Sequence, residues 1–325
     1  MPDLTDEFTW IESLRALTRG DPRALDLADD AAIAPARPGF DLVISVDAMI
    51  EGVHFLADEA ADVVARRLLR TSLSDLAAKA VEPFGYLLTT AWPSNRDAVW
   101  RARFRDGLDE DGRRYGVALF GGDTVSTPGP LALNATVLGW IEAGRMVRRS
   151  GAMSGDAMLA CGAIGDGWLG LKAARGEITD GDGALARAYR LPEPRFDLRQ
   201  PLRLHAHAAA DVSDGLIADA GHIAAASGLG LEIQLEDLPL SRAAKTWVAS
   251  QPVRAEALAA LAGGGDDYAI ACAVPEDSVA AVLAAARAGG SPAARVGRLV
   301  AGAGLKIMAG EHQIRPARSG FRHGG

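Results

Sequence analysis

Residues 41–55 read DLVISVDAMIEGVHF, and their first half alternates with the period of a β-strand. Aliphatic side chains occupy the even positions from 42 to 46, whereas Ser45 and Asp47 fall on the other face. The alternation predicts a strand over 41–47 with Asp47 near its end. A strand holds such a residue rigidly, so its carboxylate is a candidate functional group.

The sequence on both sides of this strand predicts further helices and strands. Helical spacing and composition favour helices over 7–19, 60–80, 95–115, 166–175, 216–227, 255–262 and 277–288. Strand patterns cover 85–91, 117–120, 131–140, 157–161, 230–235, 268–274 and 294–299. Turn residues gather at 28–32, and 191–201 is a Pro-rich link. The mixture predicts an α/β or α+β fold.

The chain has 325 residues, a length that favours two domains. The turn-rich motif RSGAMSGD occupies 149–156. We therefore expect one domain over 1–148 and a second over 149–325.

Composition narrows the functional classes. Acidic residues outnumber basic ones by 42 to 34, giving a formal charge of -8, which disfavours a general nucleic-acid binder. Cys161 and Cys272 are the two cysteines, too few for a disulfide framework. The acidic start lacks a signal-peptide pattern, and no apolar run reaches the roughly 18 residues of a membrane helix. A cytoplasmic protein without membrane attachment is expected.

Carboxylates that follow apolar runs carry the first chemical signal. Asp47 follows the strand at 41–47, and Asp123 follows the apolar run 117–120 and two glycines. Each alone has an ordinary explanation, because Asp is common in turns and helix caps. If the two strand ends converge, however, the like charges require cations. Oxygen ligands suit Mg²⁺, which also coordinates phosphate.

Two glycine-rich segments are candidates for phosphate contact. The Walker pattern GxxxxGK[ST] is absent, and the two segments considered are Gly121-Gly122-Asp123-Thr124 and Gly263-Gly264-Gly265-Asp266-Asp267. Glycine allows close approach of a ligand to the backbone, although tight turns use the same residues. No Ser, His or Asp has a clear nucleophile-plus-base arrangement, so covalent catalysis by a side chain is not expected.

Taken in order, these segments resemble the thiamine-monophosphate kinase family, in the aminoimidazole-ribonucleotide-synthetase-like superfamily. The resemblance covers about residues 28–323. The matching stretches are Asp29-Asp30-Ala31-Ala32, the segment 45–55, SLSDLAA at 72–78, Gly121-Gly122-Asp123-Thr124, Arg149-Ser150-Gly151, DVSDGL at 211–216, GGDDY at 264–268 and GFRH at 320–323.

The resemblance implies ATP-dependent phosphorylation of thiamine monophosphate to thiamine diphosphate. It implies several Mg²⁺ ions held by Asp30, Ser45, Asp47, Asp75, Asp123, Asp211 and Asp214. ATP contacts fall on Gly122, Asp123, Arg149 and Ser213, and substrate contacts on His54, Asp266 and Phe321. The implied fold is a two-domain synthetase-like fold, in which the N-terminal sheets of two subunits pair in a homodimer and the C-terminal domain is mixed α/β. Asp266 stands where relatives usually have Glu.

Three other readings compete with this one. A related synthetase or ligase would share the superfamily's fold, but a selenophosphate-synthetase-like enzyme would need a Cys near the N-terminus and none precedes Cys161. A non-catalytic Mg²⁺-nucleotide-binding dimer would not need all six aspartates. A metal-dependent phosphatase would explain the acidic residues but not the order of the segments.

Overall fold

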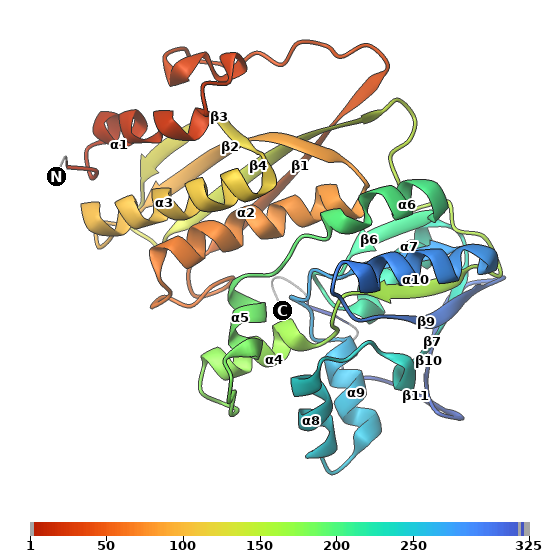
Figure 1. Cartoon of the computed structure of the whole chain (residues 1–325). Helices are drawn as coiled ribbons and strands as arrows, with labels where there is room; N and C mark the ends of the chain where they lie inside the picture. Colours follow the sequence, from red (N-terminus) through yellow and green to blue (C-terminus); the bar gives the residue numbers. More distant parts are fainter. Residues whose placement is uncertain (1–2, 318–319, 322–325) are drawn as a thin grey trace. The chain divides into compact units, whose positions relative to one another are not determined.

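Two separate sheets organise the chain. The computed structural model describes residues 3–317, 320 and 321 (Figure 1). One structural unit comprises Met1–Leu76 and Val81–Gly144, and the other comprises Ala77–Ala80 and Arg145–Gly325. The expected two-domain mixed α/β class is confirmed. The division after Gly144 falls just before the boundary expected at 148/149.

The first unit is a four-stranded sheet with two long helices. Its elements are α1 (Glu7–Leu14), β1 (Phe40–Ile50), α2 (Ala61–Ala78), β2 (Glu82–Trp92), α3 (Ala98–Tyr115), β3 (Ala118–Ser126) and β4 (Ala132–Glu142). The strand order is β1-β4-β2-β3, so β1 and β3 are the two edges. Figure 1 shows α2 and α3 along one face of this sheet.

The two faces of this sheet differ in burial. Met49 pairs with Leu133, and both are buried on the face that carries the odd-numbered residues of β1. On the other face, Ile44 and Val46 are each 58% exposed. A row of aliphatic side chains on the edge strand β1 is therefore exposed to solvent. Such a row is unusual on the surface of a monomeric protein.

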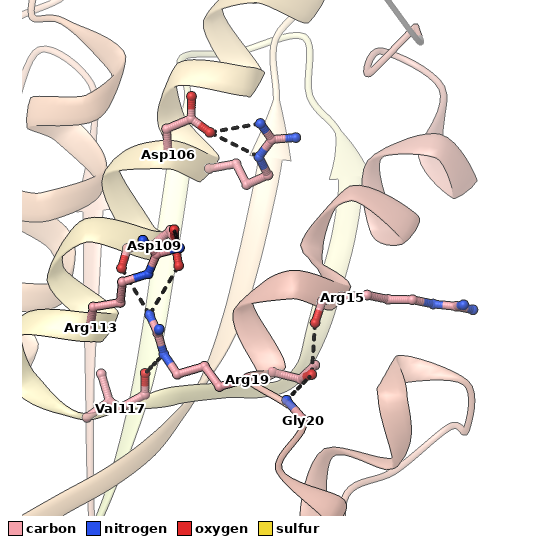
Figure 2. A network of polar contacts seen from close by, with 9 residues as sticks. Arg15, Arg19, Gly20, Asp106, Asp109, Arg113 and Val117 are labelled. Atoms are coloured by element: carbon pink, nitrogen blue, oxygen red, sulfur yellow. Dashed lines mark hydrogen bonds and ion pairs between the residues drawn. The ribbon is translucent and has the colours of Figure 1, made fainter.

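Polar contacts fix the N-terminal segment to the sheet unit. Arg19 donates to the carbonyl oxygen of Val117 at 3.1 Å and to that of Asp109 at 2.9 Å, and Arg113 pairs with Asp109 at 2.6 Å (Figure 2). The guanidinium thus links the N-terminal segment to α3 and to the residue before β3.

The second unit is built on a seven-stranded mixed sheet of order β11-β10-β7-β9-β5-β8-β6. Its strands are β5 (Ala157–Cys161), β6 (Ala208–Asp211), β7 (Gly230–Gln234), β8 (Ile270–Val274), β9 (Ala293–Val300), β10 (Gly304–Ala309) and β11 (His312–Ile314). Its helices are α4 (Asp166–Ala174), α5 (Ala184–Arg190), α6 (Arg199–His205), α7 (Leu216–Ala226), α8 (Arg242–Ala249), α9 (Arg254–Ala262) and α10 (Val279–Ala288).

The core of the second unit consists of small and aliphatic side chains. The central strands β5 and β8 are buried along their whole lengths, and Ile217 and Ile223 of α7 pack into the same core. Added volume in such a close-packed core is destabilising. Within the described residues, no helix has both the length and the apolar character needed to span a membrane.

Candidate functional site

Ser45, Asp47 and Asp75 form one polar cluster in the first unit. Ser45 and Asp47 are two positions apart on β1, so they lie on the same face of the strand. Asp75 comes from α2, and its Oδ2 accepts a hydrogen bond from the Ser45 hydroxyl. All three residues are half-buried. Their donors are all oxygens, a set that fits Mg²⁺.

The environment of Asp47 disfavours its charged form. Burial first, and then the charge of Asp75, raise the pKa of Asp47 to about 6, although contact with the Ser72 hydroxyl lowers it in part. Two crowded carboxylates of this kind are costly when ionised. A divalent cation removes that cost, so the cluster has the electrostatic character of a metal site.

Asp123 does not join this cluster within one chain. β1 extends to Ile50 and β3 to Ser126, so Asp47 and Asp123 lie inside their strands rather than at converging ends. Asp123 pairs with Thr89, Thr89 with Asn134, and Asn134 with Ala48. Asp123 therefore shares the sheet face of Ala48, opposite to Asp47, and lies three strand spacings, roughly 14 Å, from β1. The condition that these two strand ends converge is therefore not met within a single chain.

Gly122 precedes Asp123 at a position that admits no side chain. Its φ is +157°, and an added Cβ would lie 1.7 Å from the carbonyl oxygen of Leu88. Asp123 itself is exposed. Glycine is therefore required by the packing of β3 on β2, whether or not a ligand also approaches it.

Asp30 and His54 lie outside regular elements of the first unit. Asp30 is exposed in the segment before β1. His54 is half-buried in the turn after β1, where its Nδ1 accepts a hydrogen bond from the Ile50 amide at 3.0 Å. That bond fixes the imidazole and leaves Nε2 as its second polar atom.

In the second unit, two loops and the C-terminal tail meet. The amides of Tyr268 and Asp266 donate to the carbonyl oxygens of Val212 (2.9 Å) and Ser213 (2.8 Å). The Phe321 amide donates to the carbonyl oxygen of Asp214 at 2.9 Å. The structure thus brings together three segments that are far apart in sequence, 211–215, 263–268 and 320–321, and each carries expected site residues.

Two non-glycine residues of the 263–268 segment have a strained backbone. Asp266 has a φ of 67° and Tyr268 a φ of 49°, both in the left-handed region. This conformation is energetically unfavourable for non-glycine residues, and it persists where surrounding contacts enforce it. Here the enforcing contact is Asp267, whose carboxylate accepts from the amides of Gly165 (2.8 Å) and Gly167 (2.9 Å) at the start of α4.

A cavity of about 440 Å³ lies beside this meeting point. Ile217 and Gly221 of α7, Leu231 of β7 and Leu305 of β10 supply an apolar wall, whereas Asp214 and Phe321 also line it. Phe321 is 50% exposed. An apolar cavity with a carboxylate and an aromatic ring suits an organic ligand with a cationic or polar end.

The remaining expected residues lie near the same loop. Asp211 is buried at the end of β6, and Ser213 is exposed two residues later. Arg149 is exposed, and its charge acts on Asp219.

Sequence reasoning missed two acids of the second unit, Asp219 and Asp267. Asp219 is 3% exposed, and its pKa is raised to about 7 by burial first and then by the charge of Asp214. Oxygen or nitrogen atoms of Asp214, Asp219 and His222 lie within 4.8 Å of one another. Burial raises the pKa of Asp267 well above its usual range. For Asp219, the signal in the sequence was an acid on the apolar face of a helix, between Ile217 and Ile223.

Comparison with known proteins assigns the family. Residues 28–141 match the AIR synthase related protein N-terminal domain, and residues 154–310 match the corresponding C-terminal domain. The thiamine-monophosphate kinase of Caulobacter vibrioides is 55% identical over 319 residues, covering 98% of this chain and 91% of that protein.

Solved structures agree with this match. The crystal structure of thiamine-monophosphate kinase from Stenotrophomonas maltophilia K279a is 32% identical with a TM-score of 0.83, covering 94% of this chain and 98% of that one. The structure of AaThiL complexed with AMPPCP and TMP is 25% identical with a TM-score of 0.77, covering 98% and 96%. The chain therefore belongs to the thiamine-monophosphate kinase family of AIR synthase related proteins.

Proposed function

We propose that this protein is a thiamine-phosphate kinase, which transfers the γ-phosphoryl group of ATP to thiamine monophosphate and releases thiamine diphosphate and ADP. The observation that carries the proposal is 55% identity to a thiamine-monophosphate kinase along 98% of the chain. A relative of the same fold has been solved with AMPPCP, an analogue of ATP, and TMP.

The acidic residues support a role for Mg²⁺ in this reaction. Ser45, Asp47 and Asp75 would hold the metal in the first unit, and Asp211 and Asp214 in the second. The remaining expected ligands are Asp30 and Asp123. Bound Mg²⁺ would neutralise the repulsion between the donor and acceptor phosphates.

The other expected residues would bind and orient the two substrates. Gly122, Asp123, Arg149 and Ser213 are assigned to ATP, where the Arg149 guanidinium adds a fixed positive charge. Phe321 offers an aromatic face to the rings of the acceptor, and Asp266 and His54 offer hydrogen-bonding groups. These residues position an in-line transfer and exchange no covalent bond with the phosphoryl group.

The open face of the first sheet supports a homodimer. Leu42, Ile44 and Val46 form an exposed aliphatic row on the edge strand β1. A second copy of the chain would remove this row from water. The cytoplasmic location expected from composition stays a prediction.

The experiment is direct. The purified protein is incubated with ATP, Mg²⁺ and thiamine monophosphate, and the thiamine compounds are separated by chromatography. We expect thiamine diphosphate in amounts equal to ADP. Absence of thiamine diphosphate, with ADP formed from ATP alone, would support the phosphatase alternative instead.

A further inference from the structure

Asp219 binds the backbone of the loop that carries Asp214. It lies in the first turns of α7 and is 3% exposed. A single oxygen, Oδ2, accepts hydrogen bonds from the amides of Asp214 and Gly215, both at 3.1 Å. The arrangement is similar to a capping box, in which an acid of the first turn returns to the backbone ahead of its own helix.

Several other peptide groups of this loop have partners elsewhere. The carbonyl oxygens of Val212, Ser213 and Asp214 accept from the 266–268 segment and from the tail. The amide of Val212 donates to the carbonyl oxygen of Ala269 at 2.8 Å. Asp219 completes this set by taking the amides of Asp214 and Gly215, which would otherwise be held away from water without an acceptor.

Gly215 leaves the loop little freedom to move. Its φ is +126°, and an added Cβ would lie 2.9 Å from the carbonyl carbon of Gly263. The loop is therefore packed on one side against 263–265 and tied on the other to Asp219. Its position depends on both contacts.

We propose that Asp219 is a positioning residue, which fixes the backbone of Asp214 and so sets the affinity of the site for Mg²⁺. The inference rests on the proposed function for the identity of the metal. Removal of a group that orients a metal ligand commonly weakens metal binding by 10-fold to 100-fold, on the order of what is expected here.

Because one oxygen of Asp219 accepts both hydrogen bonds, substitutions can separate its positioning role from an effect of its charge. An asparagine at 219 keeps one carbonyl oxygen that can accept both amides but carries no charge. A glutamate keeps the charge but is longer by one methylene group, which displaces the acceptor. Positioning predicts that Asp219→Asn is the milder change, whereas an electrostatic role predicts that Asp219→Glu is.

The experiment compares Asp219→Ala, Asp219→Asn and Asp219→Glu with the wild-type chain. The first readout is the rise in Tm on titration with Mg²⁺ in the presence of AMPPCP, which requires no turnover. The second is the Mg²⁺ concentration for half-maximal thiamine diphosphate formation. Asp180→Ala is the control, because Asp180 also accepts from two backbone amides, those of Leu185 (3.4 Å) and Ala186 (2.8 Å), outside this loop.

We expect Asp219→Ala to raise the required Mg²⁺ concentration about tenfold or more in both readouts. Asp219→Asn should stay within about threefold of wild type, because both hydrogen bonds persist. Asp180→Ala should lower the Tm without changing the response to Mg²⁺. If Asp219→Ala does not fold, the Mg²⁺ requirements of Asp219→Asn and Asp219→Glu are compared instead. The proposal then requires the smaller increase in the Asn variant.

Three results would overturn the inference. The first is a lowered Tm of Asp219→Ala with an unchanged Mg²⁺ response. The second is a wild-type chain whose Tm does not respond to Mg²⁺, and the third is an Asn variant as impaired as the Ala variant. A wild-type chain that binds Mg²⁺ with AMPPCP but forms no thiamine diphosphate would refute the proposed function and leave the Tm comparison valid.

Discussion

At the scale of single residues, Asp47 couples stability to pH. Its pKa is about 6 in the folded chain, against an ordinary value of 3.8. Between these values the folded state binds more protons than the unfolded state, so stability falls as pH rises through the window and the cost persists above it. Each unit of difference is worth about 1.4 kcal/mol.

We therefore expect Asp47→Asn to raise the Tm of the metal-free protein at pH 7.5. The gain should be on the order of 3 kcal/mol, and it should largely disappear near pH 3, below both pKa values, where the carboxyl group is mostly neutral in the folded and the unfolded chain. Mg²⁺ should stabilise the wild type more than the variant. Thermal melts at the two pH values check this, and an equal difference at both would argue that the charge of Asp47 costs nothing.

Phe321 is the residue on which acceptor recognition depends in this account. Phe321→Ala removes the ring from the cavity wall but keeps the amide that donates to Asp214. We expect the KM for thiamine monophosphate to rise about tenfold, or about 1.4 kcal/mol, with the KM for ATP little changed.

Phe8→Ala is the matched control, because Phe8 is 76% exposed on α1 in the other unit. It should leave both KM values as they are. A lower Tm of Phe321→Ala with an unchanged KM for thiamine monophosphate would mean that Phe321 contributes to stability and not to acceptor binding.

At the scale of elements, we expect two glycine-to-alanine substitutions to have opposite effects on stability. Gly122→Ala places a Cβ against the carbonyl of Leu88 in β2 and should cost several kcal/mol, or about the range of severe packing defects. Gly221→Ala lies inside α7, where the nearest atom to its Cβ, in Leu305, is 3.9 Å away. It should stabilise the protein by up to about 1 kcal/mol through helix propensity. Urea unfolding of both variants measures the contrast, and similar free energies of unfolding would contradict the packing described for β3.

The elements also show where sequence reasoning succeeds. The strand at 41–47 and the helix at 60–80 have strong periodicity, and the structure places β1 and α2 there. β6 was missed because Ala208–Asp211 contains three alanines, which have no strand preference and form a strand only by pairing with β8. α5 and α6 were missed because each has only seven residues, and Pro192 follows α5 while Pro201 lies inside α6.

The site shows the same division. Ser45, Asp47 and Asp75 meet as strand and helix periodicity allows, and Asp214 and Phe321 meet through a contact between distant segments. The separation of Asp123 from Asp47 follows from strand order and register, neither of which a single sequence contains.

At the scale of the whole molecule, the exposed row on β1 predicts an oligomer. We expect a dimer by sedimentation equilibrium, and Ile44→Lys should convert it to a monomer, because a buried unpaired charge opposes association. Val99→Lys is the control, since Val99 is 56% exposed on α3. A monomeric wild type, or a dimer unaffected by Ile44→Lys, would mean that this face has another role.

The central claim is direct phosphoryl transfer to thiamine monophosphate. The most direct measurement uses ATP labelled in its γ-phosphoryl group, with Mg²⁺ and thiamine monophosphate, and follows the label by mass spectrometry in every product and in the protein. The account predicts label in the terminal phosphate of thiamine diphosphate, one ADP for each product, and none on the protein when the acceptor is omitted. Label recovered in stoichiometric amount on the protein, or only as inorganic phosphate, would contradict it.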